Sequence, residues 1–210
     1  MYFPEFDLRY FLLTMVALVI CITIHEFAHA YAAVRAGDDT PRRDGRISLN
    51  PIDHLEPLGT MMMVLTSLGG FGFGWGKPVR VNHLRFRNPR WDNLRVSAWG
   101  PGSNILTAAV LGFGIRFFGS HMSGPVFEFV LKVTSISLVL AFFNLIPVGP
   151  LDGAHVVSSL LPADQARRYD VFMMRYGFMI LLAILILGLV PTIIGPPVRF
   201  LLRAFTGSLW

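Results

Sequence analysis

The sequence has little charge and almost no cysteine. Only 15% of its 210 residues are Asp, Glu, Lys or Arg, whereas soluble domains carry about 25% charged residues. Hydrophobic residues make up 53% of the chain and the mean hydropathy is +0.56, so the composition predicts a protein of the lipid bilayer. The single cysteine, Cys21, excludes an intrachain disulfide and therefore a disulfide-stabilised secreted fold.

Other features are also missing. No basic stretch alternates with aromatic residues, so the net charge of +5 does not indicate nucleic-acid binding. No internal repeat, low-complexity tract or linker occurs, and we expect residues 1–210 to form a single integral-membrane domain. The first ten residues contain Glu5, Asp7 and Arg9 rather than the basic start of a signal peptide. We therefore expect the apolar stretch that follows to be retained.

Five apolar stretches have the length to enter a membrane, because a bilayer core of about 30 Å needs roughly 20 helical residues. Four of them predict transmembrane helices. The second is rich in glycine, which disfavours a continuous helix, and we expect it to enter and leave on the same side. The predicted fold is thus an all-α polytopic membrane protein with about four transmembrane helices and a re-entrant segment. The five stretches are Tyr10–Val34, Pro57–Gly76, Val96–Ile115, Val133–Leu151 and Tyr176–Val198.

Residues 73–82, which overlap the end of the re-entrant segment, contain glycines followed by alternating apolar and polar side chains. This pattern fits a short β-strand or β-hairpin with an unpaired edge, and it fits a plain surface loop equally well.

The distribution of basic residues predicts the orientation. If the second stretch is re-entrant, 13 of the 18 basic residues share one side, which the positive-inside rule makes cytoplasmic. The protein is then a multi-pass protein of the cell membrane with its N-terminus outside. The 13 residues are Arg35, Arg42, Arg43, Arg46, Lys77, Arg80, Arg85, Arg87, Arg90, Arg95, Arg167, Arg168 and Arg175, and the other five are Arg9, Arg116, Lys132, Arg199 and Arg203.

The first apolar stretch contains the pattern H-E-x-x-H, formed by His25, Glu26 and His29. Two histidines four residues apart lie on one face of a helix, so both imidazoles can bind one metal ion. The glutamate between them is placed to act as general base on a water molecule that the metal activates. Ionisable side chains are costly inside a membrane, which indicates function rather than helix packing.

A hydrolytic zinc site needs a third protein ligand and one open position. Asp152 is the best candidate, because it is the acid attached directly to the end of an apolar stretch, after Pro147 and Pro150. In the re-entrant topology the stretch Val133–Leu151 returns to the cytoplasmic side and brings Asp152 to the two histidines. If the second stretch crossed the membrane fully, Asp152 would emerge on the opposite face.

At this point the chain resembles the site-2 protease family of intramembrane zinc metalloproteases, peptidase M50. It is most similar to the short prokaryotic subgroup that has neither a PDZ nor a CBS domain. The resemblance extends over nearly the whole chain and rests on four motifs in order, which are His25–His29, Asn50–Gly59, Gly100–Asn104 and Asn144–Gly153.

The resemblance implies a three-helix catalytic core with one Zn²⁺ per chain. It also implies hydrolysis of peptide bonds in single-span membrane proteins, within the bilayer near the cytoplasmic side, and a β-element around residues 72–82 that holds substrate extended. Asn144 resembles an asparagine that contacts substrate and assists the oxyanion. Asn104 either bonds to neighbouring helices or lines the site.

Several alternatives stay open. A metal-ion transporter is the second hypothesis, although transporters typically show internal repeats, and a pseudoprotease that binds membrane segments without cutting them is the third. His54 and Glu56 are either extra ligands or part of a solvated interfacial turn, with the turn favoured. For Cys21 we favour a packed residue over a ligand. The sequence contains nothing that predicts the oligomeric state.

Overall fold

The structure is a computed structural model and describes residues 7–68 and 74–207. In this described part the chain is almost entirely helical. Its only β pairing is an isolated antiparallel bridge between Leu55 and Gly76. The α-helices are α1 (Leu8–Ala36), α2 (Thr40–Arg43), α3 (Pro57–Leu68), α4 (Pro89–Phe118), α5 (Gly124–Asn144), α6 (Asp152–Leu160), α7 (Ala163–Ile186) and α8 (Val190–Thr206).

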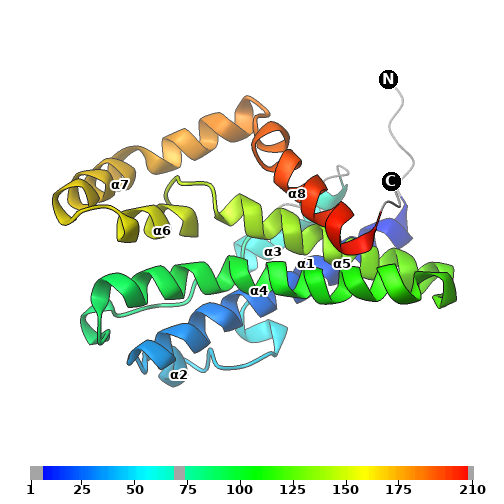
Figure 1. Ribbon diagram of the computed structural model, residues 1–210, viewed down its shortest axis with the longest axis horizontal. Coiled ribbons are helices and arrows are strands. Elements are labelled where there is room, and N and C mark those ends of the chain that lie inside the picture. Colours follow the sequence, from blue (N-terminus) through cyan, green and yellow to red (C-terminus); the bar gives the residue numbers. More distant parts are fainter. Residues whose placement is uncertain (1–6, 69–73, 208–210) are drawn as a thin grey trace.

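Four of these helices are long and apolar enough to cross a membrane, which confirms the prediction of about four transmembrane helices. They are α1, α4 together with the short turn after it, α5 and α7. Helices α1, α4 and α5 lie side by side along the long axis of the molecule, with the start of α1 and the end of α8 at one end and α2 and α6 at the other (Figure 1). The protein is therefore a multi-pass membrane protein.

The two ends of helix α1 are determined by capping residues, in addition to its apolar sequence. The Asp7 carboxylate accepts a hydrogen bond from Tyr10 N at 3.0 Å, which caps the first turn. At the other end Gly37 has φ 111°, a left-handed conformation that glycine adopts without strain and that stops the helix. These two caps fix where α1 begins and ends, and they make it slightly longer than the predicted Tyr10–Val34.

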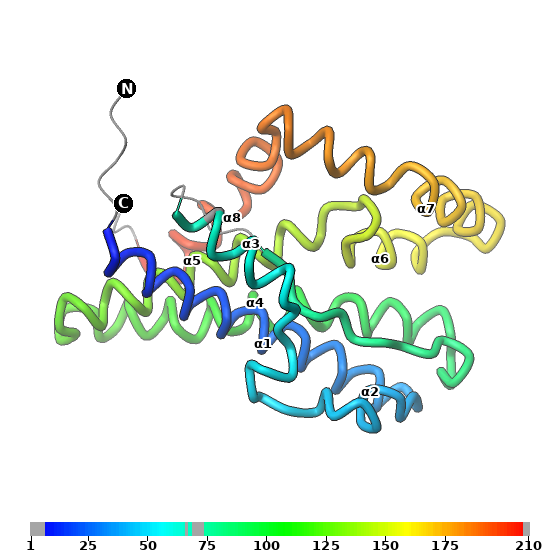
Figure 2. Tube along the Cα trace, turned by 180° about the vertical axis from the view of Figure 1, so that it is seen from behind, coloured from blue at the N-terminus to red at the C-terminus, as the bar shows by residue number. Residues whose placement is uncertain are grey.

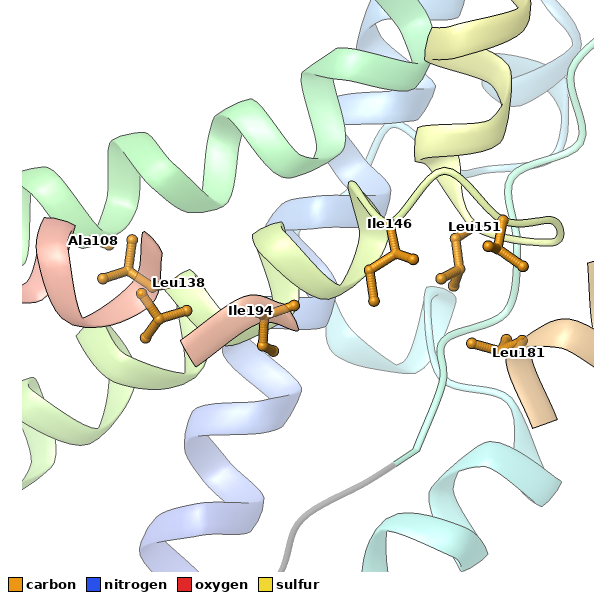
Figure 3. Close-up of a cluster of buried hydrophobic side chains, with 8 residues drawn as sticks. Ala108, Leu138, Ile146, Leu151, Leu181 and Ile194 are labelled. Carbon is orange, nitrogen blue, oxygen red and sulfur yellow. The ribbon is translucent and has the colours of Figure 1, made fainter. Parts of the chain in front are cut away.

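A contiguous apolar core connects α4 and α5 with the loop before α6 and with α7 and α8. Ile146 and Leu151 of that loop face Leu181 and Ile194, while Ala108 and Leu138 extend the same core (Figure 3). Pro147 lies within this loop, and α5 ends at Asn144, so the predicted break of the helix is confirmed. The packing fixes the loop from which α6 starts.

The predicted stretch Tyr176–Val198 is wrong as a single helix. Helix α7 ends at Ile186 and α8 begins at Val190, because Gly188 takes a left-handed φ of 64° and Pro191 occupies the first turn of α8. Helix α7 also starts at Ala163, before the predicted Tyr176, so the polar residues between these two positions form its first turns. Length and hydropathy do not mark this break, because the residues on both sides of Gly188 are apolar. Pro191 does predict a helix break near this end of the stretch, whereas Pro196 and Pro197, which predict the same, lie inside α8.

The predicted re-entrant segment begins as helix α3, whose 12 residues rise about 18 Å and fall short of a bilayer core. Both ends of the segment meet, since Leu55 pairs with Gly76 and Lys77 N donates to His54 O at 2.7 Å. Figure 2 shows α3 running along α1. Residues 69–73, which include the start of the predicted hairpin, lie outside the described residues. Residues 74–82 contain the single bridge and no hairpin, so that prediction is not confirmed.

Candidate metal centre

Three side chains predicted as metal ligands converge although they come from distant parts of the chain. His25 Nε2 and His29 Nε2 lie 3.1 Å apart, as expected for neighbours on one face of α1. Asp152 Oδ2, at the start of α6, lies 3.2 Å from His25 Nε2 and 3.1 Å from His29 Nε2. Among the described residues this trio is the one His, Cys, Asp and Glu cluster compact enough to hold a metal ion.

The geometry of this trio fits zinc. A tetrahedral zinc site with bonds of about 2.0–2.1 Å places its ligand atoms about 3.3–3.4 Å apart. The three measured separations, 3.1, 3.1 and 3.2 Å, form a nearly equilateral triangle of almost that size. Such a triangle is one face of a tetrahedron. The fourth corner is not supplied by these residues, which is the arrangement of a catalytic rather than a structural zinc site.

Space beside the two imidazoles is provided by Gly100 of α4. A Cβ atom at this position would lie 2.2 Å from His29 Nε2 and 2.8 Å from His25 Nε2. No side chain larger than hydrogen fits there while both ring nitrogens keep their positions. The glycine therefore lets α4 approach the ligand cluster closely.

The second nitrogen of His29 has a partner that fixes the ring. His29 Nδ1 lies 2.8 Å from Val96 O, so Nδ1–H donates to that carbonyl and Nε2 is left to bind the metal. His25 Nδ1 is buried and has no hydrogen-bond partner among residues 7–68 and 74–207. Helix α4 thus orients one of the two imidazoles directly through its backbone.

Asp152 is delivered by a tightly packed loop and a short helix. A Cβ at the adjacent Gly153 would lie 2.4 Å from Leu145 O, so α6 starts directly against the end of α5. The far end of α6 is held by Arg90, which donates to Ser159 O at 2.8 Å and to Leu160 O at 3.1 Å. As a metal ligand, the Asp152 carboxylate would bind in its ionised form.

Glu26 is half-buried and lies against the segment that follows the re-entrant stretch. A Cβ at Gly76 would lie 3.3 Å from Glu26 Cγ and 3.1 Å from His54 O, so the backbone passes close to the glutamate. Buried Arg46 holds this segment by donating to Lys77 O and to Asp53 O. Burial lowers the pKa of Arg46, whereas the negative charge of Glu26 raises it, so the two groups are electrostatic neighbours.

The two asparagines predicted near the site differ in their surroundings. Asn144 is the last residue of α5, and its Nδ2 donates to Leu140 O at 2.9 Å. Asn104 is 1% exposed and lies one turn after Gly100 on α4. Within the described residues its Nδ2 has no hydrogen-bond partner, so it carries a buried donor that is free to bind a ligand.

Other polar candidates serve the fold. His54 is fully buried rather than solvated, and its Nε2 lies 2.6 Å from Ser48 O, so the expectation of a solvated turn was wrong for this residue. Glu56 caps α3 by accepting from Gly59 N at 2.6 Å. Cys21 is buried beside Ser137 Oγ at 3.2 Å. None of the three belongs to the metal-ligand trio.

Comparison with known proteins agrees with this geometry. The sequence profile "Peptidase family M50" matches residues 113–187, a region that contains Asp152. A Bacillus subtilis protein named "Putative zinc metalloprotease YwhC" is 33% identical over 204 residues, which cover 93% of this chain and 89% of that protein. This chain belongs to peptidase family M50. The M50 protease is also 30% identical over 184 residues to "Putative zinc metalloprotease Rip2" of Mycolicibacterium smegmatis, covering 84% of this chain and 67% of that protein.

A more distant archaeal relative, "Zinc metalloprotease MJ0392" of Methanocaldococcus jannaschii, is 22% identical over 146 residues, which cover 70% of this chain and 33% of that protein. No solved structure matches the chain with significance. The M50 protease is accordingly a zinc metalloendopeptidase, and its cofactor is Zn²⁺. Family membership favours the protease over a metal-ion transporter, one of the alternatives that the sequence left open.

Three residues around the site were not identified as its neighbours from the sequence. Gly100 lets the backbone of α4 approach the two histidines, and Gly76 lets its own segment approach Glu26. Arg46 holds the segment that carries Gly76. A signal for Gly100 existed, because a Gly-Pro pair inside an apolar helix indicates a close approach of another element. No comparable signal distinguishes Arg46 from the other basic residues.

Proposed function

We propose that this M50 protease hydrolyses peptide bonds within the membrane-spanning segments of single-span membrane proteins. The observation that carries this proposal is the position of the two histidine ligands along α1. With a rise of 1.5 Å per residue, His25 and His29 lie about 16 and 10 Å before the C-terminal end of this apolar helix. The metal centre is therefore at membrane depth, in the half of the bilayer nearer that end.

The roles of the residues follow from their atoms. His25, His29 and Asp152 would hold the zinc through Nε2, Nε2 and a carboxylate oxygen. When bound, zinc acts as a Lewis acid on the scissile carbonyl and on the attacking water. Glu26 takes a proton from that water as the water oxygen forms a bond to the carbonyl carbon. Glu26 then gives this proton to the amide nitrogen as the C–N bond breaks.

Two amide side chains are proposed to assist. The buried and unpartnered Nδ2 of Asn104, one turn beyond Gly100, is a donor for substrate or for the oxyanion. Asn144 carries a second Nδ2 proton besides the one it donates to Leu140 O, and we assign it the same kind of contact. Both groups are uncharged, so they stabilise the developing negative charge without a titration of their own.

A helical substrate must unwind locally before its amides are accessible to water. Within the described residues, positions 78–81 form no backbone–backbone hydrogen bond, and they follow directly on Gly76, which lies against Glu26. We propose that an extended substrate pairs with this segment, because exposed backbone groups can accept an added strand.

The basic end of the molecule is proposed to face the cytoplasm. Thirteen of the 18 basic residues belong to the segments at the α2 and α6 end, where α1 ends (Figure 1). The positive-inside rule then places the N-terminus outside and the metal centre near the cytoplasmic surface.

The test is cleavage of single-span substrates in proteoliposomes, with the products mapped by mass spectrometry. Glu26→Gln should keep one zinc per chain and lower the cleavage rate by about 10²–10⁴-fold, the contribution of a general base. Glu128→Gln is the matched control, since it removes a carboxylate at the opposite end of α5, where Glu128 pairs with Arg9. This control should cleave at the wild-type rate.

Two results would contradict the proposal. Cleavage by Glu26→Gln at the wild-type rate would remove Glu26 as the base. Products cut only outside the apolar segment of the substrate would show that the enzyme does not act at membrane depth.

A further inference from the structure

A cavity of about 520 Å³ lies at the C-terminal end of α1, apart from the metal centre. Its charged lining is unbalanced, because three guanidinium groups face a single carboxylate. The lining residues are Val34, Arg35, Gly37, Asp39, Arg42 and Arg87. The cavity therefore has a formal charge of +2, which favours an anionic ligand.

The backbone brings Arg87 to this cavity. Arg87 N donates to Ala36 O at 3.1 Å, which ties the segment before α4 to the last turn of α1. The side chain of Arg87 then passes over Gly37, where a Cβ would lie 3.6 Å from Arg87 Cγ. Since Gly37 also has φ 111°, a larger residue would be strained there and would crowd the arginine.

Two of the three guanidinium groups have no carboxylate partner. Arg42 lies 3.4 Å from Asp39, but both side chains are more than half exposed, so their attraction is weak. Within the described residues Arg35 and Arg87 form no ion pair, although both line the cavity. Unpaired arginines that converge on one cavity are suited to bind a phosphate, because a guanidinium donates two parallel hydrogen bonds to its oxygens.

Two exposed aromatic residues indicate how deep the cavity lies in the membrane. Tyr31 is one helical turn before Arg35 on the same face of α1, and its ring lies 6.0 Å from that of Trp99 on α4. Tyr31 and Trp99 are 39% and 49% exposed. Exposed Tyr and Trp side chains on membrane helices concentrate at the headgroup level. Arg35 and the cavity are therefore at or just beyond that level.

We propose that this cavity binds the phosphate group of an anionic membrane phospholipid through Arg35, Arg42 and Arg87. Free phosphate offers the same chemistry, but the adjacent aromatic pair places the cavity where lipid headgroups are concentrated. Arg35 belongs to α1 and Arg87 to the segment that leads into α4. A bound headgroup thus joins the helix that carries both histidines to the segment that follows residues 74–82.

The experiment uses the full chain in nanodiscs and measures bound lipid by native mass spectrometry. Phosphatidylglycerol is the anionic probe, phosphatidylcholine is the zwitterionic comparison, and inorganic phosphate is added to zwitterionic nanodiscs in a separate arm. The triple variant Arg35→Gln, Arg42→Gln and Arg87→Gln tests the cavity. The control, Arg167→Gln, Arg168→Gln and Arg175→Gln, removes the same charge from exposed positions on α7.

Wild type should retain phosphatidylglycerol in preference to phosphatidylcholine. The cavity variant should weaken that binding by at least about tenfold, because each lost guanidinium removes charge-assisted hydrogen bonds to the phosphate that a distant arginine does not make. The α7 control should change it much less. If the cavity variant fails to bind zinc, and is therefore misfolded, Arg87→Gln alone should weaken binding by about tenfold, the loss expected for hydrogen bonds to a charged group.

Three results would overturn the proposal. Equal losses in the cavity variant and the α7 control would show general surface charge rather than a site. Equal retention of the two lipids by wild type would show that no anionic headgroup is selected. Saturable binding of inorganic phosphate that depends on the three arginines and displaces phosphatidylglycerol would assign the cavity to a free anion.

Discussion

Replacing Gly100 by alanine should disable the metal centre without altering any charged group. The new methyl carbon would lie 2.2 Å from His29 Nε2, 2.6 Å from His29 Cε1 and 2.8 Å from His25 Nε2. A van der Waals contact needs about 3.5 Å, so the His29 ring must move by more than about 1 Å. A zinc bond tolerates about 0.2 Å. We therefore expect zinc affinity to fall at least about 100-fold, or roughly 2.8 kcal/mol.

The assay is the zinc content of the purified protein together with competition against a chelator. Gly102→Ala is the matched control, because Gly102 lies on the same helix and a Cβ there meets no atom within 4 Å. Both substitutions raise helix propensity by about 1 kcal/mol, so only the contact with the histidines separates them. A Gly100→Ala protein that holds one zinc and competes like wild type would refute the proposed geometry.

Two further predictions test the elements that hold the site and its neighbouring segment. Arg90→Ala removes the hydrogen bonds to the carbonyls of Ser159 and Leu160 at the end of α6, so Asp152 should be held less firmly. Zinc affinity should then fall about 10-fold in the chelator assay. The control Arg95→Ala should not change the zinc affinity, because the partner of Arg95 is Asp92 on the same helix. Asp38→Asn should destabilise the fold by about 1–3 kcal/mol, because an amide nitrogen then faces the N–H of Asn82 or Thr40. Burial on its own raises the pKa of Asp38, but hydrogen bonds from Thr40 and Asn82 lower it below its usual value. Its contribution is therefore present above pH about 4 and lost as the pH falls through the lowered pKa, so thermal unfolding should show the gap between wild type and variant closing in acid.

The convergence of the metal ligands was predictable, because simple periodicities decide it. His25 and His29 face the same way by helical geometry, and Asp152 joins them once α5 returns to the end where α1 terminates. The basic residues predicted that return through a re-entrant second stretch, and this membrane topology is still a prediction. The side of the membrane and the roles of the individual residues are still predictions.

Packing details were not predictable from the sequence. Pro191 predicts a break between α7 and α8, but its position depends on one left-handed glycine, Gly188, inside an apolar run. The burial of His54 depends on Lys77 and Ser48 reaching it from two separate loops. Such contacts are made between segments far apart in the chain, and local propensity carries no information about them.

The contacts around the metal centre share one feature that explains how an ionisable cluster is held in an apolar helix bundle. Each of these side chains lies next to a glycine. Gly76 contacts Glu26, Gly100 contacts both histidines, and Gly153, which follows Asp152 in the chain, packs against the end of α5. A network of further polar side chains would be costly in an apolar helix bundle, since each would need its own partner. Glycines instead let the backbones of neighbouring elements approach closely, so that steric contacts hold the ligands in place. The geometry of this site therefore depends on close backbone packing, and we expect a single methyl group in such a contact to disturb it as effectively as the loss of a ligand.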